Sequence, residues 1–122
     1  MPLLRFVEAT AIDDDDPQAG IHLEVTARAL NAVGVLHGGV VSTLLDVAAY
    51  LALVPELASD EEAITHALFV SYQQGAKTAD RVVAVGRVRR RGRQLAFVDS
   101  ELSRNGQLLA AAQVTKSILK RG

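Results

Sequence analysis

The strongest signal in the distribution of hydrophobic positions is a single apolar segment in the first half of the chain. It covers residues 40–54, contains one charged residue, Asp46, and is followed by Pro55. A proline cannot continue a helix, because it lacks an N–H group and its ring clashes with the preceding turn. The segment is shorter than the roughly 20 residues that a membrane-spanning helix needs, and its charge lies near the middle. We therefore predict a buried core helix and no membrane association.

Two shorter segments before this helix predict strands. Residues 3–10 are mostly apolar and predict a first short strand. Residues 21–28 alternate between apolar and polar positions with the period of two that a half-buried strand shows. The alternation places His22 on the solvent-facing side. Between the two segments, a run of aspartates followed by Pro17 predicts a solvated loop.

The second half of the chain predicts four more strands and an antiparallel sheet. Segments rich in Val, Phe, Leu or Thr cover residues 64–73, 81–90, 94–103 and 107–118. Arg91-Gly92 and Asn105-Gly106 predict tight turns, so the last three strands should form an antiparallel meander. No further helix is available for a parallel crossover. An apolar helix is hidden on every side only if this sheet wraps around it, which predicts an α+β fold in one domain, residues 1–122.

Composition narrows the range of functions. The chain has 122 residues, of which 49% are hydrophobic and 22% are charged, as is typical of one globular domain. It has no cysteine, which excludes disulfides and a cysteine nucleophile and, with no recognisable secretory signal, predicts a cytoplasmic location. A net charge of -1 and an aromatic content of 4% predict no nucleic-acid partner. The three histidines lack the close His/Glu pairing of a zinc site, so no metal is expected.

The polar residues of the predicted helix lie on one side. At about 100° per residue, about one third of the helix circumference carries Gly39, Ser42, Thr43, Asp46 and Tyr50. A carboxylate in such a place costs several kcal/mol unless it has a partner. Asp46 is therefore either a polar contact at a wet subunit interface or a catalytic group, and the pattern alone does not choose between them.

The start of the helix offers a second polar feature. Gly38 and Gly39 are poor first-turn residues, and no Ser, Thr or Asp precedes them as a side-chain cap. The first backbone N–H groups are then expected to be free for an anion, or for a carbonyl oxygen that gains negative charge. An ordinary loop-to-helix turn with water on these groups is the alternative interpretation.

These residues together resemble the signature of a known family. Asn31, His37-Gly38-Gly39 and Leu45-Asp46 are similar to the motif of hotdog-fold acyl-CoA thioesterases. Within that family they resemble the branch of phenylacetic-acid-pathway (PaaI-type) and thioesterase superfamily member 2 enzymes. The likeness covers nearly the whole chain, because a central helix followed by antiparallel strands is the order of elements in the hotdog fold.

The resemblance implies a role for each residue of the motif. The Gly38 amide would polarise the thioester carbonyl, with His37 supporting that turn. Asp46 would be the nucleophile or the general base, and Asn31 would hold the thioester or the water. Thr65 matches a Ser or Thr that in this branch assists the carboxylate or the water.

The substrate implied by the resemblance is an acyl-CoA with an aryl or medium-chain acyl group, hydrolysed without a cofactor. The polar side of the helix, with Gly39, Ser42 and Tyr50, is expected to contact this substrate. The arginine-rich hairpin leaves two interpretations open. Arg89 and Arg91 either belong to a solvated hairpin whose charges resist edge pairing, or bind the phosphates of coenzyme A.

Two other functions stay open from the sequence. The first is a hotdog protein that binds acyl-CoA as a sensor and does not cleave it. The second is a hotdog dehydratase or hydratase of 3-hydroxyacyl thioesters, which needs a histidine and a carboxylate that converge on the acyl chain.

The spacing along the helix predicts an oligomer. Gly38 and Asp46 are separated by about 12 Å along a helix axis, too far for both to touch one thioester from the same chain. If two helices lie antiparallel in a two-fold dimer, the amino end of one meets the middle of the other at two equal sites. We therefore expect a homodimer with shared active sites, and the resemblance implies that dimers pair further into a homotetramer.

Overall fold

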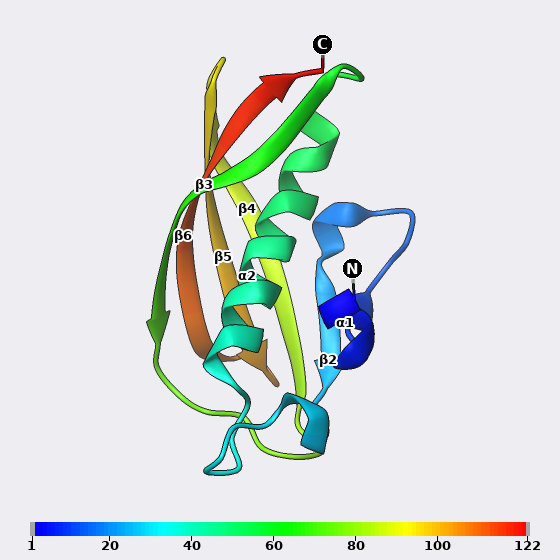
Figure 1. Ribbon diagram of the computed structural model, residues 1–122, viewed down its shortest axis with the longest axis vertical. Helices are drawn as coiled ribbons and strands as arrows, with labels where there is room; N and C mark the ends of the chain where they lie inside the picture. Colours follow the sequence, from blue (N-terminus) through cyan, green and yellow to red (C-terminus); the bar gives the residue numbers. More distant parts are fainter. Residues whose placement is uncertain (1, 122) are drawn as a thin grey trace.

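One curled sheet and one long helix make up the computed structural model of the protein, which describes residues 2–121 (Figure 1). The helices are α1 (Pro2–Phe6) and α2 (Gly38–Leu53), and the strands are β1 (Thr10–Ala11), β2 (Ile21–Glu24), β3 (Glu61–Tyr72), β4 (Arg81–Arg91), β5 (Leu95–Arg104) and β6 (Gln107–Lys120). Short 3-10 turns cover Pro17–Ala19, Ala27–Ala29 and Val54–Glu56. The sheet order is β1-β2-β4-β5-β6-β3, and all neighbours are antiparallel. The predicted α+β architecture is confirmed.

Helix α2 lies along the inner face of the sheet because one of its sides is almost purely apolar (Figure 1). Its buried residues are Val40, Val41, Leu44, Leu45, Ala48, Ala49, Ala52 and Leu53. They pack mainly against β4, β5 and β6. The helix lies close to β4 at Gly86, where a Cβ atom would be 2.6 Å from the Ala48 carbonyl oxygen. By length and composition alone, α2 with its following turn resembles a membrane span, but here its apolar side packs on the sheet.

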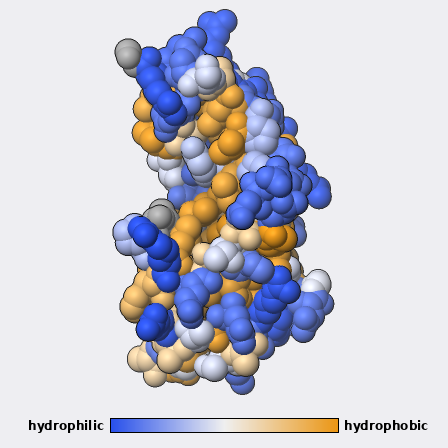
Figure 2. Space-filling view, turned by 90° about the vertical axis from the view of Figure 1, so that its right-hand side faces the viewer, coloured by the Kyte–Doolittle hydropathy of each residue, from blue (hydrophilic) through white to orange (hydrophobic). Residues whose placement is uncertain are grey.

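The opposite side of α2 is only partly covered, so the prediction that the sheet hides the helix on every side is wrong. Asp46, Val47 and Tyr50 on this side are half-buried. In the space-filling view, a band of apolar side chains reaches the surface between hydrophilic segments (Figure 2). The sheet curls around the helix without closing, because β3 meets β6 on one edge and no strand on the other among residues 2–121.

The long edge strand β3 exposes large hydrophobic side chains. Ile64, Phe69 and Tyr72 are 53%, 70% and 56% exposed. An unpaired strand edge with such side chains is a ready surface for pairing with a second chain.

The chain before α2 differs from the sequence predictions. The strand predicted over residues 3–10 is wrong: Pro2 occupies the first helical position of α1, where its missing N–H costs nothing, and only Thr10–Ala11 pairs in the sheet. The strand predicted over residues 21–28 ends at Glu24, because Ala27–Ala29 forms a 3-10 turn. Within β2 the expected alternation holds, with Ile21 and Leu23 buried.

The strands after α2 follow the sequence predictions more closely. Asn105 and Gly106 have φ angles of 50° and 79°, as the predicted two-residue hairpin turn requires. The turn predicted at Arg91-Gly92 is longer than expected. Arg91 is the last residue of β4, and residues 92–94 form the loop, closed by the Gly92 N–H donating to the Leu95 carbonyl at 2.8 Å.

Candidate active site

The first turn of α2 presents one free N–H group. His37 is the N-cap residue, and its Nδ1 atom accepts the Gly39 N–H at 2.8 Å. The prediction that the first N–H groups of this helix are free is therefore wrong for Gly39. Among residues 2–121, no acceptor contacts the N–H of Gly38. The helix start thus offers a single donor, reinforced by the positive end of the helix dipole.

Asn31 organises the loop that leads into this helix. Its Oδ1 atom accepts the N–H groups of Val33 at 3.0 Å and Val35 at 3.1 Å. Its own N–H donates to the Val35 carbonyl at 2.8 Å. The side-chain oxygen of Asn31 is therefore engaged within the loop, which leaves the amide NH2 group as the part that can reach a ligand.

A cavity of about 310 Å³ lies beside the helix start. Gly38, Asn31 and Tyr72 line it together with buried apolar residues such as Leu36 and Leu109. The Tyr72 hydroxyl donates to the Gly38 carbonyl at 3.1 Å, which ties β3 to the first turn of α2. Two residues of the motif, Gly38 and Asn31, therefore line the same cavity.

The carboxylate of Asp46 belongs to a second polar group, farther along α2. The Thr65 hydroxyl on β3 lies 2.8 Å from Asp46 Oδ1 and 2.9 Å from Oδ2. The Lys116 ammonium on β6 donates to Asp46 Oδ1 and to Thr65 Oγ1, both at 2.9 Å. The Asp46 side chain is 31% exposed, whereas that of Lys116 is only 4% exposed. The ion pair is thus buried at its cationic end and open at its anionic end.

Sheet register brings Thr65 and Lys116 together. They are direct cross-strand partners in the β3–β6 pair, and the register shifts between Thr65 and Ala67. Such a bulge changes the side-chain alternation of the strand locally, and bulges are common next to functional sites. Both partners therefore meet Asp46 across the space between sheet and helix.

Sequence reasoning missed Lys116 as a member of the site. The signal that would have found it is the alternation of β6, in which Val114, Lys116 and Ile118 share the buried phase. A lysine in an apolar phase needs a carboxylate partner, and Asp46 was the one charge on the facing helix.

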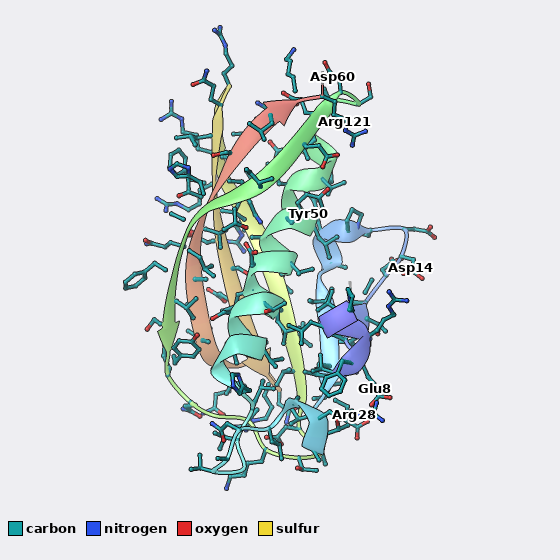
Figure 3. The ribbon with its side chains drawn as sticks, viewed as in Figure 1. Glu8, Asp14, Arg28, Tyr50, Asp60 and Arg121 are labelled. Carbon is teal, nitrogen blue, oxygen red and sulfur yellow. The ribbon has the colours of Figure 1, made fainter. Side chains whose placement is uncertain are left out.

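The other residues predicted to contact substrate lie either at the start of α2 or near Asp46. Ser42 contacts the Tyr72 hydroxyl near the helix start. Tyr50 lies one turn beyond Asp46, on the upper half of α2 (Figure 3), and its ring centroid is 5.8 Å from Lys116 Nζ. Gly39 stays at the helix start, where its N–H is bound to His37.

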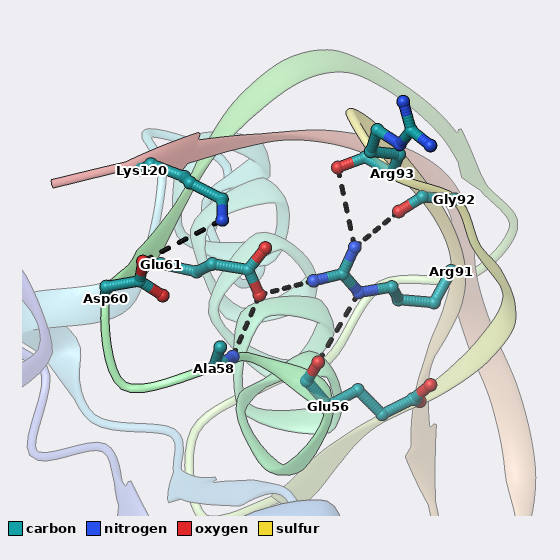
Figure 4. A network of polar contacts seen from close by, with 8 residues as sticks. All are labelled: Glu56, Ala58, Asp60, Glu61, Arg91, Gly92, Arg93 and Lys120. Atoms are coloured by element: carbon teal, nitrogen blue, oxygen red, sulfur yellow. Dashed lines mark hydrogen bonds and ion pairs between the residues drawn. The ribbon is translucent and has the colours of Figure 1, made fainter.

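The arginines predicted to bind CoA phosphates lie in different settings. Arg89 forms an exposed ion pair with Asp99 at 3.5 Å. Arg91 is ion-paired with Glu61 and donates to the carbonyls of Glu56 and Gly92 (Figure 4). These contacts occupy the guanidinium donors that a phosphate would need.

The same network perturbs Glu61. The Ala58 N–H donates to its carboxylate at 2.8 Å, and this bond together with the Arg91 guanidinium holds the pKa of Glu61 below its usual value. The network joins the turn after α2 to the start of β3 and the end of β4.

Comparison with known proteins gives concordant matches. The family described as "Thioesterase superfamily" matches residues 33–111. Human acyl-coenzyme A thioesterase 13 is 30% identical over 100 residues, which cover 79% of this chain and 69% of the human protein.

Solved structures match over most of the chain. A phenylacetic acid degradation-related protein from Ralstonia eutropha JMP134 has a TM-score of 0.81 and 25% identity, covering 95% of this chain and 89% of its own. A protein from Streptococcus mutans UA159 bound to acetyl-CoA has a TM-score of 0.74 and 28% identity, covering 84% of this chain and 82% of its own.

Proposed function

The chain belongs to the thioesterase superfamily and has the hotdog fold, and on this premise we propose that it hydrolyses acyl-CoA at a site shared between two subunits. One observation carries the proposal: α2 holds a free Gly38 N–H at its start and an ion-paired, half-exposed Asp46 carboxylate near its middle. These are the two groups that thioester hydrolysis needs, an oxyanion donor and a base or nucleophile.

The reaction divides between these two groups. As a general base, Asp46 takes a proton from a water molecule whose oxygen attacks the thioester carbonyl carbon. The electron pair moves onto the carbonyl oxygen, where the Gly38 N–H stabilises it. The C–S bond then breaks as the electron pair returns, and the proton passes to the departing CoA sulfur. As a nucleophile, Asp46 instead attacks the carbonyl carbon and expels the CoA thiolate as the C–S bond breaks. Water then hydrolyses the resulting mixed anhydride to the free acid and the Asp46 carboxylate, and the same N–H serves both routes.

Two subunits are needed to bring these groups to one carbonyl. Gly38 and Asp46 are about 12 Å apart along α2 if the helix has its usual rise. The open edge of β3 and the half-buried side of α2 provide a surface for a second copy. An antiparallel pair of β3 strands places the two α2 helices antiparallel, so that Gly38 of one copy faces Asp46 of the other.

The acyl group is proposed to be aryl or medium-chain. The cavity of about 310 Å³ beside Gly38 is largely apolar and lies at the small end of ligand-binding pockets. The likeness to the phenylacetic acid degradation-related protein supports the aryl option. The likeness to the Streptococcus mutans protein, whose structure contains acetyl-CoA, supports coenzyme A as the carrier of the acyl group.

The cytoplasmic location and the pairing of dimers into a tetramer remain predictions. For the CoA phosphates, we propose that Arg89 contributes more than Arg91, because its partner Asp99 is an exposed carboxylate, and solvent weakens such pairs.

Thiol release from a panel of acyl-CoA substrates tests this function. The panel contains phenylacetyl-, hydroxybenzoyl-, hexanoyl- and palmitoyl-CoA. We expect turnover of the first three, and a loss of about 10²–10⁴-fold in Asp46→Asn, since that is the usual contribution of a general base. Asp60→Asn is the matched control, because Asp60 forms an exposed ion pair with Lys120 at 3.9 Å.

Three outcomes would contradict the proposal. Binding of acyl-CoA without any thiol release by the native protein would indicate a sensor. Hydration of crotonyl-CoA without thiol release would indicate a hydratase. Equal turnover in Asp46→Asn and the native protein would remove Asp46 from the mechanism.

A further inference from the structure

Lys116 is the buried cation of the site, and the reaction described above does not use it. Its side chain points inward from β6, and the residue as a whole is 3% exposed. Of the charged residues 2–121, Lys116 is the only one that falls in the buried class. An unpaired ammonium in such a place is costly, so Lys116 requires a nearby negative charge.

The contacts of Lys116 fix the direction of the hydrogen bonds around Asp46. An ammonium group donates and cannot accept. Because Lys116 donates to Thr65 Oγ1 at 2.9 Å, the Thr65 oxygen is an acceptor there. The single hydroxyl hydrogen of Thr65 is then available for the Asp46 carboxylate. Thr65 therefore donates its hydroxyl hydrogen to the Asp46 carboxylate and does not accept a proton in the reaction.

The two carboxylate oxygens of Asp46 are left unequal by this arrangement. Oδ1 accepts from Lys116 at 2.9 Å and lies 2.8 Å from Thr65 Oγ1. Oδ2 has one contact among the described residues, with Thr65 at 2.9 Å. Oδ1 is therefore held by both Lys116 and Thr65, whereas Oδ2 keeps more of its lone-pair capacity for a further partner, and the Asp46 side chain is 31% exposed.

From this asymmetry we propose that Lys116 is the positioning residue of the hydrolytic site. It holds the Asp46 carboxylate through Oδ1 and Thr65, so that Oδ2 is the oxygen presented to the water or the thioester. This inference rests on the proposed thioesterase function and adds the atom that reacts. Lys116 itself touches neither substrate nor reacting atoms.

Lys116 also has a role in the second half of the reaction. When Oδ2 has taken the proton from water, Asp46 is neutral and Lys116 loses its counter-charge. Its remaining neighbours are the Thr65 hydroxyl and the Tyr50 ring, 5.8 Å from Nζ. Transfer of the proton from Oδ2 to the departing thiolate sulfur then restores the negative charge of Asp46 and, with it, the ion pair with Lys116.

The test compares three lysine variants in steady-state thiol release. Lys116→Met keeps the length of the side chain and removes its charge, and Lys116→Arg keeps the charge. Lys120→Met is the matched control, since Lys120 is on the same strand in an exposed ion pair. We expect Lys116→Met to lower kcat by about 10²-fold with KM within about twofold, because a small misplacement of a reacting group has an effect of that size. Lys116→Arg should recover part of kcat, and Lys120→Met should match the native protein.

A double variant keeps the inference testable if Lys116→Met does not fold. Asp46→Asn with Lys116→Met removes both charges together, so no buried charge is left unpaired. If Lys116 acts through Asp46, the double variant has the same residual rate as Asp46→Asn alone. A further loss of rate in the double variant would overturn the inference.

The failures of the two proposals are distinguishable. If the native protein releases no thiol from any substrate, the proposed function and the role of Lys116 both fall. If the native protein is active and Lys116→Met changes only KM, or changes nothing, the thioesterase assignment stands and the positioning role is overturned.

Discussion

At the scale of single residues, the proposed chemistry depends on the Gly38 N–H, which has no acceptor among residues 2–121. His37 accepts the neighbouring N–H of Gly39, so its side chain secures the helix start while the N–H of Gly38 stays free. The N–H that His37 caps, that of Gly39, and the proposed oxyanion donor, that of Gly38, therefore belong to neighbouring residues. The contribution of this donor can be removed without removing the helix.

Replacing Gly38 with proline deletes the N–H group and puts the ring Cδ atom in place of its hydrogen. Proline is favoured at the first helical position, and His37, with φ -60° and ψ 132°, already has the backbone that a residue before proline adopts. We expect Gly38→Pro to lower kcat by about 10²–10³-fold, the usual effect of losing one oxyanion donor.

Gly38→Ala is the matched control for this prediction. It keeps the N–H, and its Cβ atom would lie 3.6 Å from the Tyr72 ring, which is an ordinary contact. Steady-state thiol release and circular dichroism of both variants check the result. Equal activity of Gly38→Pro and Gly38→Ala would mean that the Gly38 N–H does not stabilise the oxyanion.

The sequence identified some of these residues and missed another for a physical reason. Asp46 stands out because it is one charge in an apolar helix, a pattern visible along the chain. Lys116 can be recognised as a site residue only when it is known which side chains of β6 face the interior, since its partners Asp46 and Thr65 come from other elements. Contacts between elements far apart in sequence leave little local signal.

At the scale of elements, the network around Arg91 connects the end of α2 to two strands. Its guanidinium is ion-paired with Glu61 at the start of β3 and donates to the Glu56 carbonyl after the helix (Figure 4). The network fixes the upper end of β3, the strand that also carries Thr65. We therefore expect it to contribute to stability more than to phosphate binding.

This network predicts a stability loss in acid. The pKa of Glu61 is lowered in the folded protein by the Ala58 N–H and Arg91, so the ionised form is favoured by folding. The resulting stability is present above the unfolded pKa, about 4.3, and is lost as pH falls through the lower folded value. Urea unfolding of Glu61→Gln should show lower stability than native at pH 7 and a smaller loss between pH 6 and pH 3.

Glu56→Gln is the control for this measurement, because Arg91 bonds to the backbone carbonyl of Glu56 and not to its carboxylate. It should follow the native pH dependence. An unchanged pH dependence in Glu61→Gln would show that this carboxylate does not contribute to acid unfolding. The Asp80 carboxyl, whose pKa is lowered by the Lys77 N–H and Arg104, contributes in the same direction in all three proteins.

The elements themselves were predictable where periodicity is long. Helix α2 and strands β4 to β6 each repeat their pattern over ten or more residues, and the Asn105-Gly106 turn has a strong local preference. Helix α1 has only five residues, so its apolar positions fit a strand equally well. Local sequence also did not show that one side of α2 stays half-buried, because that depends on where the curled sheet stops.

At the scale of the whole molecule, the proposed function assigns to one chain the two halves of two different sites. Gly38, Asn31 and the apolar cavity lie at the start of α2, while Asp46, Thr65 and Lys116 meet near its middle. Completing a site from these halves needs the second copy that the open edge of β3 is proposed to bind.

Subunit mixing tests this central claim most directly. Asp46→Asn and Gly38→Pro chains, each inactive, are combined by joint refolding in equal amounts. With random pairing, half the dimers carry one intact site, so thiol release should return to about one quarter of the native rate. Recovery to that level would establish that Gly38 of one copy acts with Asp46 of the other. If the mixture has dimers of both chains and releases no more thiol than either variant alone, the shared site is contradicted.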